Sequence, residues 1–197
     1  KSITLVELDP AVTNLAKAHP LLTNLNQESL TNTKVTVVNE DAQTYLEHHS
    51  DRYSVILIDL PDPNDITLGK LYTVEFYSLI AQHLAEGGVV VTQATSPYFS
   101  RSAYWCITTT MEEVFGDVVP YTVNVPSFGP WGFVMASATT IPKPTVDVAT
   151  KYLTPDIIPT LFAFDTDMQR LETDINTLDN QSLVHLYDEG WQQWYQN

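Results

Sequence analysis

Residues 53–65 read YSVILIDLPDPND, an apolar run that is followed at once by three aspartates and two prolines. A short run rich in β-branched residues and ended by prolines indicates a buried parallel strand that stops abruptly. In open α/β sheets, ligands bind just beyond the carboxyl ends of such strands. We therefore expect Asp59 and Asp62 to lie at a functional site, unless the stretch is an acidic turn whose aspartates accept hydrogen bonds from nearby backbone N–H groups.

Strands and helices are expected to alternate along residues 2–138, because short apolar runs alternate there with segments of helical period. The strands are expected at residues 2–9, 35–39, 53–58, 89–93, 118–125 and 132–138. The helices are expected at residues 10–18, 42–48, 71–85, with Gly87-Gly88 as the signal for the helix end, and 102–115. The alternation predicts a mainly parallel sheet, whereas the last two strands are joined too closely for a crossover helix and are expected to form an antiparallel hairpin.

These elements predict an α/β domain that binds a nucleoside, spanning residues 1–140 and truncated at its N-terminus. The stretch from Ile141 to Pro144 marks a boundary, and residues 141–197 are expected to form a C-terminal helical appendage. No G-x-G-x-x-G turn occurs in the sequence, so the first βα unit of such a fold is expected upstream of Lys1, in a longer protein. Without that unit, the strands near Ser2 and Ser54 are expected to pair directly or to form a dimer contact.

Composition narrows the class of protein. A hydrophobic fraction of 44% in 197 residues is enough for a core, and no apolar run approaches the ~20 residues that cross a bilayer. The formal charge of −15 repels nucleic acid and would attract cationic ligands such as amines, although acidic surfaces also serve solubility. The single cysteine, Cys106, cannot form an internal disulfide and is expected in the core, and the histidines are too scattered to predict a metal site.

Acidic residues follow three consecutive predicted strands. Glu7 ends the first strand, Asp41 follows the second, and Asp59 and Asp62 follow the third. Glu7 suits the two hydroxyls of a ribose, because a carboxylate can accept two donors at once, but it could also be a solvated acid at a strand end. Asp41 could accept a hydrogen bond from an adenine amine or cap the helix that begins at Ala42, and it can do both only if its two oxygens are divided between them.

Six stretches share their order and spacing with a known family across roughly residues 2–138. They are VELD (6–9), EDA (40–42), DLPDP (59–63), KLYTVEFY (70–77), Gln93 with Ser96-Pro97, and PSFGPWGF (126–133). The chain thereby resembles the polyamine aminopropyltransferases of the spermidine synthase family. DLPDP and the Trp131-Gly132-Phe133 segment look closest to bacterial members whose catalytic domain is fused to an N-terminal membrane region, and residues 150–197 are similar to the tail of those proteins.

The resemblance implies a Rossmann-like sheet of the S-adenosylmethionine-dependent methyltransferase type. It also implies transfer of an aminopropyl group from decarboxylated S-adenosylmethionine to putrescine, which yields spermidine and methylthioadenosine. By the family's pattern, Asp59 would be the catalytic carboxylate. The donor-binding residues would be Glu7, Asp41 and Ala42, and the acceptor-binding residues would be Asp62, Gln93 and Tyr72. The nucleoside is a co-substrate, and no other cofactor and no metal are implied.

Two other functions remain open for the same residues. A methyltransferase that uses S-adenosylmethionine shares the sheet, and a non-catalytic polyamine-binding or assembly module would keep only the amine site. The resemblance further implies small-molecule partners, no nucleic acid, a homodimer and a cytoplasmic location for this domain. It allows a parent protein that is attached to the bacterial inner membrane.

Overall fold

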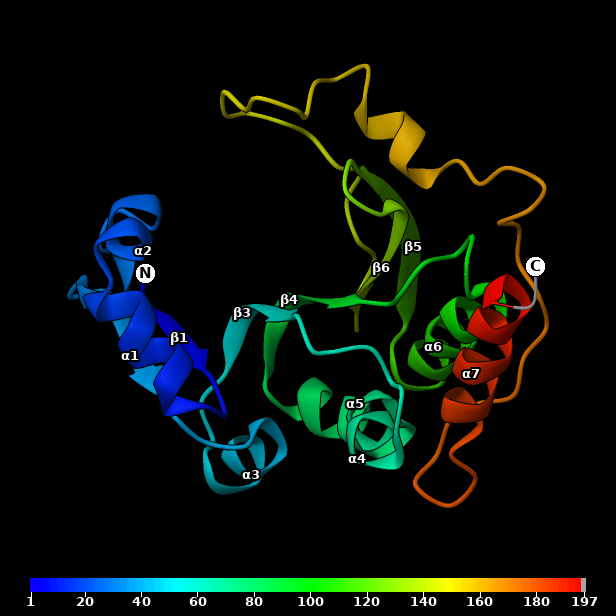
Figure 1. Cartoon of the computed structure of the whole chain (residues 1–197), viewed down its shortest axis with the longest axis horizontal. Coiled ribbons are helices and arrows are strands. Elements are labelled where there is room, and N and C mark those ends of the chain that lie inside the picture. The colour runs from blue at the N-terminus through cyan, green and yellow to red at the C-terminus, as the bar shows by residue number, and fades with distance from the viewer. Residues whose placement is uncertain (196–197) are drawn as a thin grey trace. The chain divides into compact units, whose positions relative to one another are not determined.

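A computed structural model describes residues 1–195, and the chain divides into two compact units, Lys1–Asp51 and Arg52–Asn197. Each unit has its own β-sheet (Figure 1). Residues 141–197 belong to the second unit, and their separation as a domain of their own stays a prediction. Among the residues described, none of the helices combines the length and the apolar character that a bilayer crossing requires.

The first unit is built on a parallel pair of strands. Its elements are β1 (Ile3–Val6), α1 (Pro10–Ala18), α2 (Pro20–Leu25), the 3-10 turn η1 (Ser29–Thr31), β2 (Val35–Val38) and α3 (Ala42–His48). β1 pairs with β2 from Ile3 opposite Val35 onward. α1 begins where expected, because Asp9 accepts a hydrogen bond from the backbone N–H of Ala11 at 2.7 Å and Pro10 occupies the first turn.

The second unit contains a four-stranded sheet in the order β3-β4-β6-β5. Its strands are β3 (Tyr53–Ile58), β4 (Leu84–Gln93), β5 (Asp117–Val125) and β6 (Gly129–Ser137). Its helical elements are α4 (Ile66–Gly69), the 3-10 turn η2 (Lys70–Tyr72), α5 (Val74–Gln82), α6 (Arg101–Val114), the 3-10 turn η3 (Ile158–Phe162) and α7 (Ser182–Tyr195). β3 and β4 are parallel, whereas β6 is antiparallel to both β4 and β5, which confirms the terminal hairpin.

The core of the second unit is centred on α6, which contacts α5, α7 and the β5–β6 hairpin (Figure 1). Tyr104, Ile107 and Met111 of α6 are fully buried, as is Val134 of β6. Cys106 is also buried, and burial raises the pKa of its thiol to about 12. The thiol therefore stays protonated, in agreement with the expected role as a small core residue.

The helix expected at residues 71–85 is shorter than the sequence indicated, and Gly87-Gly88 does not end it. Thr73 caps α5 by accepting a hydrogen bond from the N–H of Phe76 at 3.3 Å, and β4 already begins at Leu84. The glycines lie inside β4, where the pairing with β3 shifts register. Gly87 has a φ of 67°, and a Cβ on Gly88 would lie 2.8 Å from the Ala85 carbonyl oxygen, so the pair serves a bulge.

The direct pairing expected between the strands near Ser2 and Ser54 is not found. Among the paired strands of residues 1–195, β1 bonds with β2 alone and β3 with β4 alone. Apolar side chains of both strands remain exposed, with Ile3 of β1 at 62% and Leu57 of β3 at 74%. A dimer contact at these edges stays a prediction.

Candidate active site

The loop after β3 carries the aspartates that the sequence singled out. β3 ends at the buried Ile58, and Asp59 follows with an exposed side chain that makes no hydrogen bond to the described part of the chain. Asp65 has a structural role, because its Oδ1 accepts a hydrogen bond from the N–H of Leu68 at 2.9 Å and so caps α4. The turn interpretation thus holds for Asp65, whereas Asp59 and Asp62 are left for other roles.

Gln93, the last residue of β4, is buried and joins the predicted acceptor residues. Its Nε2 lies 3.1 Å from Asp62 Oδ1, 3.0 Å from the Tyr72 hydroxyl and 2.7 Å from the Leu60 carbonyl, and its two N–H groups are shared among these three acceptors. Its Oε1 accepts from the indole N–H of Trp131 at 3.0 Å and from the backbone N–H of Thr95 at 3.1 Å. Because two N–H groups converge on Oε1, the amide has one possible orientation, with Nε2 facing the carboxylate.

Tyr72 completes this group from the turn η2. Its hydroxyl donates to the backbone carbonyl of Pro61 at 3.0 Å and accepts from Gln93. Burial raises the pKa of Tyr72 well above its ordinary value, and the nearby negative charges of Asp62 and Asp59 raise it further. Tyr72 is therefore a neutral hydroxyl that can donate one hydrogen bond and accept others.

A strained turn follows β4 and brings Thr95 to the same carboxylate. Thr95 has a φ of 57°, in the left-handed region, and its hydroxyl donates to Asp62 Oδ2 at 3.4 Å. Its carbonyl accepts from the N–H of Gly132 at 2.7 Å. A Cβ on Gly132 would lie 2.8 Å from that carbonyl and would overlap the ring of Tyr104, so only glycine fits there.

One contact to this site comes from α7, far along the chain. The Tyr187 hydroxyl donates to Asp62 Oδ2 at 2.9 Å. The sequence analysis assigned no role to Tyr187, Thr95 or Trp131. Trp131 lay inside a quoted motif, whereas the only local signal for Tyr187 was its place one helical turn after the apolar Leu183.

The predicted donor residues lie at the carboxyl ends of β1 and β2 in the first unit. Glu7 Oε1 accepts from the N–H of Asp9 at 2.9 Å, and the Glu7 carbonyl accepts from the N–H of Glu40 at 3.2 Å, so the two strand ends are adjacent. Asp41 Oδ1 accepts from both the N–H and the hydroxyl of Thr44, at 3.0 and 3.2 Å. Asp41 therefore caps α3, whose first residue is Ala42.

Metal-binding side chains are not gathered in the part of either unit that the structure describes. Within residues 1–195, no three His, Cys, Asp or Glu side chains are arranged to hold an ion. The second unit thus brings together Asp62, Gln93 and Tyr72 close to Asp59, and the first unit brings Glu7 near Asp41 and Ala42. Carboxylates, an amide and hydroxyls are groups that form hydrogen bonds with polar small molecules, so each set remains a candidate for ligand binding.

The comparison with protein families shows which family the chain belongs to. Residues 1–149 match the spermine/spermidine synthase domain, and the chain belongs to that family.

Curated relatives from several bacteria are named polyamine aminopropyltransferases. The chain is 43% identical over 192 residues to polyamine aminopropyltransferase 2 of Ralstonia nicotianae, covering 96% of this chain and 38% of that protein. It is 45% identical over 192 residues to a polyamine aminopropyltransferase of Leptospira interrogans, covering 97% of this chain and 39% of that protein. The chain thus spans less than two-fifths of the length of these relatives.

Solved structures show the same fold. The spermidine synthase of Thermotoga maritima matches with a TM-score of 0.68 at 20% identity, over 85% of this chain and 60% of that one. A spermidine synthase in complex with the transition-state analogue AdoDATO matches with a TM-score of 0.70 at 21% identity, over 85% of this chain and 61% of that one. The family resemblance and the expected Rossmann-like fold are both confirmed.

Proposed function

We propose that the protein carrying this chain transfers an aminopropyl group from decarboxylated S-adenosylmethionine to putrescine, which yields spermidine and methylthioadenosine. The observation that carries the proposal is the hydrogen-bonded set of Asp62, Gln93 and Tyr72 next to the exposed Asp59, in a chain of the spermine/spermidine synthase family. The names of the relatives, polyamine aminopropyltransferases, support the same reaction.

The chemistry explains why a carboxylate is needed at Asp59. An alkylammonium ion has a pKa of ~10.4, so the amine must lose a proton before its nitrogen can attack carbon. Asp59 accepts that proton, a bond forms between the amine nitrogen and the donor's terminal methylene carbon, and the bond from that carbon to sulfur breaks. The electron pair stays on sulfur, which leaves as neutral methylthioadenosine. The sulfonium is already a good leaving group, so the reaction needs no metal.

The other residues bind and orient the two substrates. Asp62, with Gln93 and Tyr72 beside it, holds the amine acceptor, and such positioning can contribute as much as basicity. Glu7 accepts the two ribose hydroxyls of the donor. Asp41 and Ala42, at the start of α3, bind the adenine ring, so that Asp41 combines this contact with its cap on Thr44.

The assembly and the location of the protein are part of the same proposal. The catalytic domain comprises residues 1–140, with 141–197 as its appendage, and works on small molecules as a homodimer in the cytoplasm. The parent protein would be held at the bacterial inner membrane by a segment outside residues 1–197. The formal charge of −15 favours cationic amines as ligands and disfavours nucleic acid.

Asp59→Asn in the full-length protein tests the assignment of the base. The amide cannot accept the proton, so turnover is expected to fall at least ~100-fold in a steady-state assay of methylthioadenosine release. Asp147→Asn removes the same charge from an exposed acid after β6 and is the matched control. Near-normal turnover of Asp59→Asn would refute the assignment of Asp59 as the base.

A further inference from the structure

α7 is fixed in the second unit by contacts that do not involve its tyrosine hydroxyl. Leu183 is fully buried, and its backbone N–H donates to Asn176 Oδ1 at 3.1 Å. Gly190 lies so close to α6 that a Cβ there would be 2.9 Å from Ser100 Cα. Trp191 stacks on Phe99 with ring centroids 5.4 Å apart. The helix is therefore held at both ends by apolar and backbone contacts.

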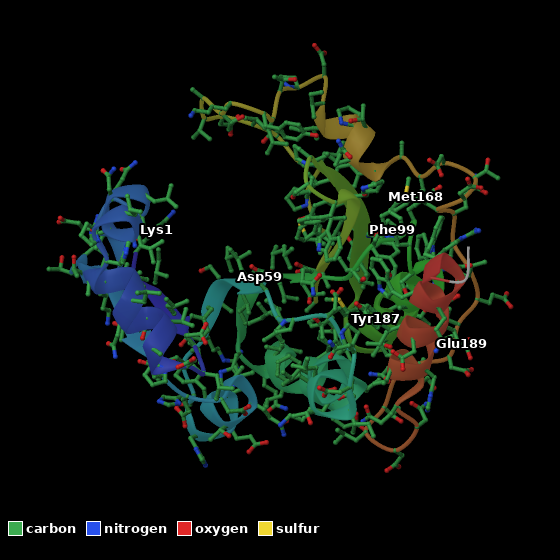
Figure 2. All side chains as sticks on the ribbon, in the orientation of Figure 1. Lys1, Asp59, Phe99, Met168, Tyr187 and Glu189 are labelled. Atoms are coloured by element: carbon green, nitrogen blue, oxygen red, sulfur yellow. The ribbon has the colours of Figure 1, made fainter. Side chains whose placement is uncertain are left out.

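The position of α7 directs the Tyr187 side chain toward Asp62. Figure 2 shows Tyr187 on the side of α7 that faces the sheet of the second unit, and Glu189 on the opposite side. Glu189 is exposed, whereas Tyr187 is half-buried, and the Tyr187 hydroxyl lies 2.9 Å from Asp62 Oδ2. The hydroxyl thus reaches the carboxylate from an element 125 residues away in sequence.

The hydrogen bonds to Asp62 leave capacity for one more donor. Its Oδ1 accepts from Gln93, and its Oδ2 accepts from Tyr187 and, at 3.4 Å, from Thr95. A carboxylate has about four lone-pair positions, so a fourth donor can still bind. Hydrogen bonds to both oxygens fix the orientation of the Asp62 carboxylate plane. Of the two bonds to Oδ2, the one from Tyr187 is shorter than the one from Thr95.

We propose that Tyr187 is a positioning residue for the amine acceptor, because its hydroxyl holds Asp62 in the orientation that receives a donor N–H of the amine. The inference rests on the proposed function and deepens it. By this inference α7, which lies within residues 141–197, contributes Tyr187 to the proposed acceptor site. Tyr187 acts through Asp62 and takes no part in the proton transfer itself.

Tyr187→Phe in the full-length protein tests the inference, because it removes the hydroxyl and keeps the ring. The loss of a hydrogen bond to a charged group is expected to raise the KM for putrescine about tenfold, while the KM for decarboxylated S-adenosylmethionine and the thermal midpoint stay unchanged. Tyr98→Phe is the matched control. Tyr98 packs on Trp194 with centroids 5.4 Å apart, and its hydroxyl has no hydrogen-bond partner within residues 1–195.

A double-mutant cycle separates positioning from a structural role. If Tyr187 acts through Asp62, adding Tyr187→Phe to the Asp62→Asn variant causes no further rise in the KM for putrescine. An active wild type with an unchanged Tyr187→Phe variant would overturn the inference alone, as would a variant in which both KM values and the thermal midpoint shift together. A wild-type protein that transfers no aminopropyl group to any amine would overturn the proposed function and the inference with it.

Discussion

Thr95 holds a backbone conformation that β-branched residues rarely adopt. Its φ of 57° puts it in the left-handed region, and its side chain is fully buried beside Asp62. The hydrogen bonds of its N–H to Gln93 and of its carbonyl to Gly132 fix this geometry. At the candidate site, strain of this kind would hold the Asp62 carboxylate in a fixed orientation before the proposed substrate binds.

A pair of substitutions at Thr95 measures that strain. Thr95→Gly and Thr95→Ala both remove the hydroxyl, but only glycine adopts a positive φ without steric cost. We expect the glycine variant to be more stable than the alanine variant by about 1 kcal/mol in urea unfolding, the reverse of the usual order. An alanine variant of equal or greater stability would show that the backbone of residue 95 carries no strain.

At the level of elements, the docking of α7 depends on Gly190. Glycine inside a helix normally costs about 1 kcal/mol relative to alanine, so Gly190→Ala should stabilise an unhindered helix. Here the added Cβ would lie 2.9 Å from Ser100 Cα and would push α7 away from α6. We expect faster amide exchange throughout α7, with a loss of about 1 kcal/mol or more in local stability.

Gln192→Ala is the control on the same helix, because Gln192 is exposed and the helix propensity changes in the same favourable direction. Its amide protection should stay equal or rise. If Gly190→Ala left the protection of α7 unchanged, the close approach of α7 to α6 would not be what fixes this helix.

Elements with local signals were predictable from the sequence. Pro10 predicted the start of α1, Asp41 predicted the start of α3, and the short link through residues 126–130 predicted the β5–β6 hairpin. Gly87-Gly88 misled because a glycine pair signals either a helix end or a strand bulge, and only the pairing of β4 with β3 distinguishes them.

The candidate site was predictable only where its residues have a local signal in the sequence. Asp59 and Asp62 follow the end of β3, where an open α/β sheet binds ligands, whereas Gln93 at the end of β4 was expected only from the family resemblance. The bond from Tyr187 to Asp62 joins residues 125 apart, and it depends on how α7 docks rather than on any local pattern. No spacing rule could have found it, because the boundary expected at residues 141–144 placed Tyr187 in a helical appendage outside the predicted catalytic domain.

For the whole molecule, the residues with proposed roles are divided between the two compact units. The residues proposed for the donor, Glu7 and Asp41, lie in the unit Lys1–Asp51, whereas the proposed base Asp59 lies in the unit Arg52–Asn197. The chain also spans less than two-fifths of its relatives, so the full-length protein is the proper subject of activity measurements. The central claim is that the group transferred is aminopropyl rather than methyl.

Product analysis of the full-length protein tests that claim most directly. The protein is supplied with putrescine and, in parallel reactions, with decarboxylated S-adenosylmethionine or S-adenosylmethionine, and the products are resolved by mass spectrometry. We predict spermidine and methylthioadenosine in equal amounts from the decarboxylated donor, and neither methylated amine nor S-adenosylhomocysteine from the other. Methylated putrescine with S-adenosylhomocysteine, or no product from either donor, would contradict the account.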